Sequence, residues 1–324
     1  MTQYRSFFNT DPPEIVRIWR KQTDRVRIAD SFSHVLFENM VLSKPYFDPA
    51  GFIVAMSGEK MLGFCHAGFA PTDDWTDLDF SQGVISLLML DGDEPPEQRA
   101  EVGVELIRRA EAYLVEKGSR QIHVGSRFPD GPFYLGLFGG SRLPGVLPER
   151  QPEFLDLLNR MGYEQTARIR ILHLRLQNFQ AVVDRQQSLI RRNYQVEAVM
   201  GPETSTWWES CVLGETDRIE FVISARKLAN PVGRVTYWDI QPLSRDWGVR
   251  TMGLFALRIE QDSRKSGLAT FLVGESLRQL KDLGVNLVEA QVIDSNAAAQ
   301  RLFDKFGFQE VDYAQSMSKK ILNA

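Results

Sequence analysis

The stretch Arg264-Lys265-Ser266-Gly267-Leu268-Ala269 lies between an apolar run at residues 252–259 and an amphipathic segment that ends at Gly284. This order predicts a strand, a short turn and a helix that begins at the turn. The first backbone N–H groups of a helix have no partner within it, and the peptide dipoles add partial positive charge there. Arg264 and Lys265 add full charges, and Gly267 has no side chain to block a ligand. The turn therefore suits a diphosphate or a similar polyanion, although a solvated turn has the same composition.

The elements around the turn decide between these two interpretations. The helix predicted at 267–283 has one apolar stripe, formed by Leu268, Phe271, Leu272, Leu277, Leu280 and Leu283. A second apolar strand follows at 287–292, and Asp294-Ser295-Asn296 then precedes an alanine-rich helix at 297–306. Gly307-Phe308 closes that helix. This order indicates a βαβα arrangement in which the turn joins the first strand to the first helix.

Two motifs in this region match a known family. Arg264-x-x-Gly267-x-Ala269 matches the Q/R-x-x-G-x-G/A turn of the GNAT superfamily of acyl-CoA-dependent N-acyltransferases. Asn296, the alanine-rich helix and Phe306-Gly307-Phe308 match that family's second motif, N-x-x-A-x-x-x-[YF]-x-x-x-G-F. The sequence thus resembles a GNAT protein, and the resemblance implies a fold with an acyl-CoA site.

Composition narrows the class of protein. The chain has 324 residues, of which 43% are hydrophobic and 25% charged, so two globular domains are expected. The formal net charge of −4 disfavours a general nucleic-acid binder. No apolar run reaches membrane-spanning length and the first residues lack a signal pattern, so we expect a cytoplasmic protein without a membrane partner. Two cysteines, Cys65 and Cys211, and four histidines predict neither a disulfide framework nor a metal site.

The order of predicted elements occurs twice. Residues 51–69 form a hairpin, followed by strand 84–90, helix 98–116, strand 121–125, helix 152–161 and strand 168–176. The hairpin at 218–225 and 233–240 begins the second series. We interpret the chain as an internal duplication: two tandem GNAT-like domains, each an α/β mixed sheet with helices on both faces. The domains are expected at 1–178 and 179–324, with the boundary in the polar segment 178–194.

The two copies differ at the turn. Aligning the helix that contains Gly103 with that of Gly267 places Ala100 where the first motif has a basic or amide residue. Five carboxylates surround this place in the first copy: Asp91, Asp93, Glu94, Glu97 and Glu101. Because these negative carboxylates would repel a phosphate, we expect the N-terminal copy to be degenerate and the C-terminal copy to bind the cofactor.

The resemblance assigns cofactor contacts to individual residues of the C-terminal copy. Leu257, Arg258 and Ile259 would offer backbone groups to the pantetheine arm, and Asn296 would contact the arm from the other side. For Asn296, an N-cap role is equally consistent with the sequence. Backbone N–H groups of the turn would hold the diphosphate, and Thr270 would add a hydroxyl. The residues of this group are Arg264, Lys265, Ser266, Gly267, Leu268, Ala269 and Thr270.

Catalytic residues are less well defined. GNAT proteins often have a tyrosine in the last helix that protonates the leaving thiolate, and Phe303 occupies the matching position. Tyr313 is the substitute that we predict, with Tyr237 and Ser295 as alternatives. Glu220 is the predicted base for the incoming amine, ahead of Asp239 and Glu260. For all of them a purely structural role is the alternative.

These features predict an N-acetyltransferase that uses acetyl-CoA and a primary amine of a small molecule or peptide. One alternative is a non-catalytic acyl-CoA-binding regulatory or interaction protein, which the loss of the tyrosine at Phe303 favours. Another is a tandem-domain ligase-like enzyme with an aminoacyl donor. The sequence does not identify the acceptor, and it is consistent with a monomer or a homodimer.

Overall fold

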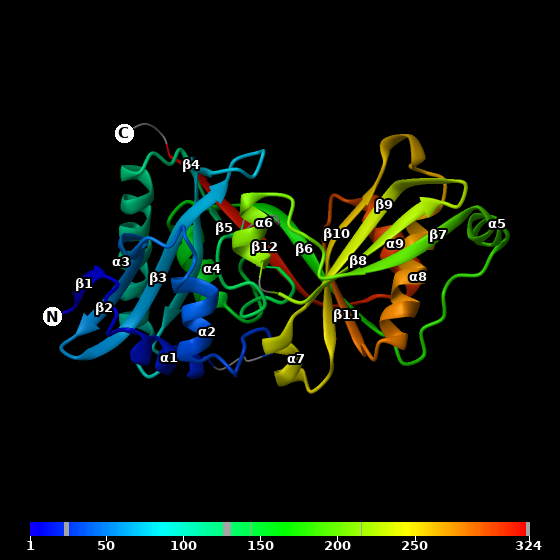
Figure 1. The fold of residues 1–324 in the computed structure, drawn as a ribbon. Coiled ribbons are helices and arrows are strands. Elements are labelled where there is room, and N and C mark those ends of the chain that lie inside the picture. The colour runs from blue at the N-terminus through cyan, green and yellow to red at the C-terminus, as the bar shows by residue number, and fades with distance from the viewer. Residues whose placement is uncertain (23–25, 126–130, 143, 215, 322–324) are drawn as a thin grey trace. The chain divides into compact units, whose positions relative to one another are not determined.

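The computed structural model describes residues 1–22, 26–125, 131–142, 144–214 and 216–321. It is a mixed α/β structure that divides into two compact units (Figure 1). Unit 1 comprises Met1–Ile169, Thr204–Gly214 and Tyr313–Ala324, and unit 2 comprises Arg170–Glu203 and Glu215–Asp312.

In unit 1, strands lie in the order β1-β2-β3-β4-β5-β12, and only the β4/β5 pair is parallel. The core lies between this sheet and α3. The strands and helices of the first part of the chain are β1 (Gln3–Ser6), α1 (Pro12–Arg20), α2 (His34–Phe37), η1 (Glu38–Leu42), η2 (Pro49–Gly51), β2 (Phe52–Ser57), β3 (Lys60–Pro71), β4 (Leu78–Leu90), α3 (Pro96–Glu116), β5 (Gln121–Val124), α4 (Pro152–Arg160) and β6 (Glu164–Arg175).

Unit 2 repeats this plan. Its strands lie in the order β11-β10-β9-β8-β7, the β10/β11 pair is parallel, and α8 joins those two strands as α3 joins β4 to β5. The remaining elements are α5 (Arg185–Asn193), β7 (Tyr194–Met200), α6 (Trp207–Leu213), β8 (Arg218–Ala225), β9 (Leu228–Asp239), α7 (Gln241–Trp247), β10 (Thr251–Ile259), η3 (Gln261–Ser263), α8 (Leu268–Asp282), β11 (Leu287–Ile293), α9 (Ala297–Phe306) and β12 (Gln309–Lys320).

Apolar residues at alternating positions place α8 on one face of the unit 2 sheet. Phe221 of β8, Val235 of β9 and Val288 of β11 are fully buried, and they share a core with Phe271 and Leu272 of α8. Their strand neighbours point to the opposite face. This alternation separates a closed, apolar face under α8 from a second face that carries polar side chains.

Each unit is completed by chain from the other half of the sequence. The C-terminal end of β12 pairs with β5 in unit 1, with Met317 opposite Val124 and Lys320 opposite Gln121. Helix α6 also belongs to unit 1, where Trp208 stacks on Tyr46 with 4.9 Å between ring centroids. In the other direction, the end of β6 belongs to unit 2. The predicted domain ranges 1–178 and 179–324 remain a prediction, since compactness alone does not test which ranges fold independently.

The structure confirms the predicted α/β class and most of its elements. It adds α5, α6 and α7, and the first of these lies inside the segment 178–194 that we expected to be a linker. Near the N-terminus, α1 ends at Arg20 and α2 begins at His34. No helix among the residues described is both long and apolar enough to cross a lipid bilayer.

Candidate active site

Strands β10 and β11 run side by side for only a short distance. Their register pairs Thr251 with Leu287, Met252 with Val288 and Gly253 with Glu289. Beyond Gly253, β10 continues to pair with β9 but not with β11, and a bulge interrupts the β9 ladder between Leu254 and Ala256. The β11-facing edge of residues 254–259 therefore lacks a strand partner in the described chain, and its backbone groups can pair with an extended ligand.

The open edge of β10 leads into the predicted turn. The Ile259 carbonyl accepts a hydrogen bond from Arg264 Nε at 3.0 Å, and Ser266 Oγ donates to the Ser263 carbonyl at 2.6 Å. These two predicted ligand contacts thus hold the turn itself together. Lys265 has a left-handed backbone, with φ of 60°, and is exposed without a partner among the residues described. Its ammonium group is the free positive charge of the turn.

Gly267 is the N-cap of α8, and no side chain caps the first turn of that helix. The amides of Leu268, Ala269 and Thr270 are therefore donors without an intrahelical partner. The Leu268 side chain is buried in the core, so this residue can offer a ligand only its backbone. An anion at this helix end would meet several N–H groups and the positive end of the helix dipole.

The role predicted for Gly267 needs one correction. Its φ of 86° does require glycine, but the space that a side chain would fill is not open to a ligand. A Cβ atom there would lie 2.9 Å from Gln186 Nε2, because α5 packs against the turn. Gln186 also donates to the Ser266 carbonyl at 2.9 Å. Gly267 therefore allows the close approach of α5, and a ligand must reach the turn from the amide side.

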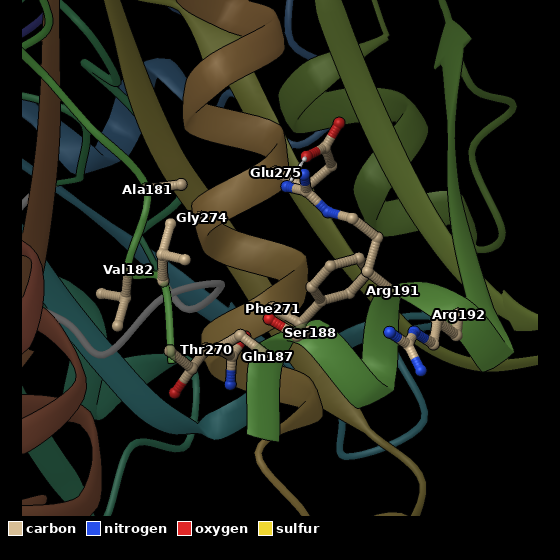
Figure 2. A pocket seen from close by; sticks show the side chains of 11 residues that line it. Ala181, Val182, Gln187, Ser188, Arg191, Arg192, Thr270, Phe271, Gly274 and Glu275 are labelled. Atoms are coloured by element: carbon tan, nitrogen blue, oxygen red, sulfur yellow. Dashed lines mark ion pairs between the residues drawn. The ribbon is translucent and has the colours of Figure 1, made fainter. Parts of the chain in front are cut away.

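A pocket of about 270 Å³ lies next to the turn, between α5, residues 181–183 and the first half of α8 (Figure 2). Ala181, Phe271 and Gly274 give it an apolar surface. Arg191 extends from α5 toward Glu275, with 3.6 Å between charged atoms. Arg192, on the same helix, has no partner in the described chain. The pocket thus combines an apolar surface with cationic side chains from α5.

The side chains of several other predicted residues make contacts within unit 2. Asn296 is the N-cap of α9, and its Oδ1 accepts from the Ala299 amide at 3.0 Å. Phe303 is 3% exposed and packs edge-on against Phe308, with 5.0 Å between ring centroids. Leu257 and Ile259 pack on the core and Arg258 is exposed, so what these three residues offer a ligand is the β10 edge.

The two predicted catalytic residues lie in different units. Glu220 is on β8, on the face of the sheet opposite α8, and accepts a hydrogen bond from Arg234 Nη1 at 2.7 Å. Tyr313 is grouped with unit 1, where the Arg168 guanidinium lies 4.4 Å from its ring centroid. Burial raises the pKa of Asp239, another of the predicted bases. Their catalytic roles remain predictions.

Comparisons with known proteins bear on this geometry. Residues 185–308 match the model of the acetyltransferase (GNAT) family. Residues 185–308 are thus similar to a GNAT domain. The matched segment covers α5 to α9 and includes the parted strands and the uncapped turn. No curated protein matches the sequence.

Solved GNAT structures resemble the entire chain. A tandem GNAT protein from the clavulanic acid biosynthesis pathway has a TM-score of 0.66 and 12% identity, with 100% of both chains covered. A GCN5-related N-acetyltransferase from Sphaerobacter thermophilus has a TM-score of 0.62 and 14% identity, covering 100% of this chain and 96% of the other. A glucosamine N-acetyltransferase region of a fungal β-N-acetylglucosaminidase has a TM-score of 0.70 and 15% identity, covering 98% of this chain and 38% of that one. At such low identities these likenesses establish the fold.

In the N-terminal copy, the loop that corresponds to the GNAT turn is closed by ion pairs. Asp91 is fully buried and lies 2.7 Å from Arg17 Nη1 and 3.2 Å from Lys21 Nζ. Although burial opposes ionisation, these hydrogen bonds lower the pKa of Asp91 to about 2. The following helix begins at Pro95-Pro96, and proline has no N–H to donate.

The alignment of Gly103 with Gly267 is wrong. Gly103 lies inside α3 rather than at its start. A Cβ there would be 2.7 Å from Leu157 Cδ1, so Gly103 serves the packing of α3 against α4. The sequence suggested that the two glycines were equivalent because each belongs to a helical segment. Gly103 lies inside its helix, however, whereas Gly267 is the N-cap of α8.

Sequence reasoning missed one polar pair in unit 2. His173 Nε2 lies 3.0 Å from Glu289 Oε2, and Glu289 is fully buried. A carboxylate within the apolar strand 287–292 was the available signal, because a buried charge requires a partner or a function. The sequence alone could not name His173 as that partner, since 116 residues separate the two.

Proposed function

We propose that this protein is an N-acyltransferase that moves an acetyl group from acetyl-CoA to a primary amine. The observation that carries the proposal is the uncapped first turn of α8 at the open end of β10 and β11, within the segment that matches the GNAT family. Acetyl-CoA supplies the activated thioester. Its polyanionic diphosphate and its amide-containing arm match the chemistry of the turn and of the β10 edge.

Three groups of residues would bind this cosubstrate. The amides of Leu268, Ala269 and Thr270, with the Lys265 ammonium, would hold the diphosphate. The backbone of residues 257–259 would pair with the pantetheine arm as an added strand. The pocket beside α5 would take the nucleotide half, with Phe271 and Arg192 as its apolar and cationic surface.

We further propose that only unit 2 binds acetyl-CoA. In the N-terminal copy, Pro95 and Pro96 remove amide donors from the start of α3. The buried Asp91 already engages the nearby cations Arg17 and Lys21. A phosphate in that loop would have to displace these pairs, and breaking buried ion pairs costs several kcal/mol. One site per chain follows.

Two measurements on the full chain test the proposal. Isothermal titration calorimetry with CoA should give saturable binding with one site per chain. Thiol release from acetyl-CoA, followed with a panel of primary amines, should show acceptor-dependent turnover. The panel includes glucosamine, because one similar structure is a glucosamine N-acetyltransferase region. A chain that binds no CoA would refute the proposal.

A non-catalytic acyl-CoA-binding protein is the second candidate. The observation that favours it is Phe303, which is buried against Phe308 and has no proton to donate to a leaving thiolate. This candidate predicts the same calorimetric binding but no thiol release above buffer with any amine of the panel. The two candidates therefore differ in a single assay on the same preparation.

A further inference from the structure

The His173–Glu289 pair is an unexplained polar group within unit 2. Glu289 is fully buried, and one of its carboxylate oxygens lies 3.0 Å from His173 Nε2. The other oxygen accepts from Gln291 Nε2 at 3.1 Å. Burying a carboxylate costs several kcal/mol unless hydrogen bonds compensate it. An apolar side chain at position 289 would fill this part of a strand without that cost, so packing alone does not explain the residue.

The pair lies where β10 and β11 separate. Glu289 is opposite Gly253 in the register, and this is the last paired position before the two strands part. Val288 and Ala290, its neighbours along β11, belong to the core under α8, so Glu289 points to the opposite face. Leu172 and Leu174 place His173 on that same opposite face.

The carboxylate fixes the state of the imidazole. With Nε2 as the donor to Glu289, the neutral ring has its lone pair on Nδ1. Nδ1 has no partner in the described chain, and the His173 side chain remains 18% exposed. Trp247 of α7 also packs on the ring, with 5.2 Å between ring centroids. Glu289 is therefore the carboxyl group in contact with the ring, and it holds the imidazole in this orientation.

We propose that His173 is the general base that removes the proton from the acceptor's ammonium group, and that Glu289 positions it. This inference rests on the proposed N-acyltransferase function. It also defines the acceptor as an amine that arrives protonated, since a base is needed only for that form.

The proton balance is simple. One ammonium proton passes to Nδ1, and the nitrogen lone pair then forms the N–C bond to the thioester carbonyl carbon. The C–S bond breaks and its electron pair goes to sulfur. The second proton leaves the nitrogen, the thiolate takes up one proton, and His173 returns its own proton to the thiolate or to water. The products are the N-acyl amine, the thiol and one released proton.

His173 suits this role better than Glu220. The Glu220 carboxylate is already engaged by Arg234 Nη1 at 2.7 Å. The His173 imidazole, in contrast, is held by Glu289 through Nε2 and keeps Nδ1 free to accept a proton. Glu220 also lies on β8, two strands away from the β10/β11 separation.

The test compares His173→Gln and Glu289→Gln with the unmodified full chain. His123→Gln is the matched control, because it makes the same substitution in unit 1, where His123 Nε2 lies 2.7 Å from Gln82. CoA affinity is measured by calorimetry. Acetyl transfer is measured by thiol release, using an accepted amine whose pKa is about 10.4, at pH 7.4 and pH 9.4. About one molecule in a thousand of this amine is neutral at the lower pH, and about one in ten at the higher.

We expect all variants to bind CoA within threefold of the unmodified chain. His173→Gln should lose at least 100-fold in kcat/KM at pH 7.4, and most of this loss should disappear at pH 9.4, where neutral amine no longer requires a base. Glu289→Gln should lose about tenfold with the same pH trend. A structural defect would lower the rate equally at both pH values, and that result would overturn the proposal.

Further outcomes separate this inference from the proposed function. A His173→Gln chain that keeps full activity would overturn the base assignment and leave the N-acyltransferase intact, as would a large loss in Glu220→Gln alone. An unmodified chain that binds CoA but acetylates no amine would overturn both. Turnover by the unmodified chain supports the proposed function whatever the His173 variant does.

Discussion

Replacing Ala269 by proline tests whether the first turn of α8 binds the diphosphate of CoA. Ala269 is the second residue of that helix, so its amide has no partner within it. Proline removes this N–H and keeps a helical backbone angle. The chain itself tolerates proline at the second helical position, as Pro13 in α1 and Pro242 in α7 show. The substitution thus deletes one donor atom and leaves the charged side chains of the turn in place.

The expected loss follows from the bond that is removed. A hydrogen bond to a charged group contributes about 1.5–3 kcal/mol, which corresponds to a CoA dissociation constant about 10- to 150-fold higher. The change in unfolding free energy should stay below about 1 kcal/mol, since no helical hydrogen bond is lost. Calorimetry with CoA measures the first quantity and urea unfolding the second.

A matched control exists in α9. Ala298 is the second residue of that helix, and Asn296 caps it through the Ala299 amide. Ala298→Pro therefore makes the same backbone change at a helix start outside the turn, and it should leave CoA affinity unchanged. If Ala269→Pro is folded and binds CoA as tightly as Ala298→Pro, the turn does not hold the diphosphate and the reasoning fails.

Three further outcomes concern stability and the N-cap. Asp91→Asn should lower the unfolding free energy by about 2 kcal/mol at pH 7, because a pKa of about 2 in place of 3.8 stabilises the folded state above pH 4; in urea unfolding the difference should shrink as the pH falls toward 2, and a constant difference would contradict the assignment. Gly267→Ala should cost about 1–3 kcal/mol more than Gly307→Ala in the same measurement, since both residues have positive φ but only Gly267 is in contact with α5. Asn296→Ala should cost about 1 kcal/mol and Asn296→Asp almost nothing, because aspartate also caps a helix. A fall in CoA affinity in Asn296→Asp alone would show that the lost amide group contacts the ligand.

Local pattern was sufficient to predict most of the fold. Alternating apolar residues predicted the hairpins, and the glycine that ends α9 at Gly307 has the left-handed backbone expected of a helix C-terminus. Helix α5 was missed because its segment is rich in glutamine and arginine. Its capping signal was nevertheless present: Asp184 accepts from the Gln187 amide at 2.7 Å. Composition suggested a linker where the cap indicated a helix.

The candidate site was predictable only in part. The turn from Arg264 to Gly267 is contiguous, so its residues are neighbours in any fold that places a helix after a strand. The contact of Gln186 with that turn and the pairing of His173 with Glu289 depend on which strands and helices become neighbours. The periodicity of apolar residues within one helix or strand does not predict such long-range contacts. The backbone role of residues 257–259 followed from the family resemblance rather than from the residues themselves.

The passage of β6 into unit 2 and of the last strand into unit 1 affects how the protein can be dissected. A gene cut at residue 178 would give an N-terminal product without the strand opposite β5, and a C-terminal product without the imidazole of His173. Neither product alone should have the activity, and mixing the two could restore it only by complementation. A duplication that ends in such an exchange is difficult to reverse, because either half alone would expose unpaired strand edges to aggregation.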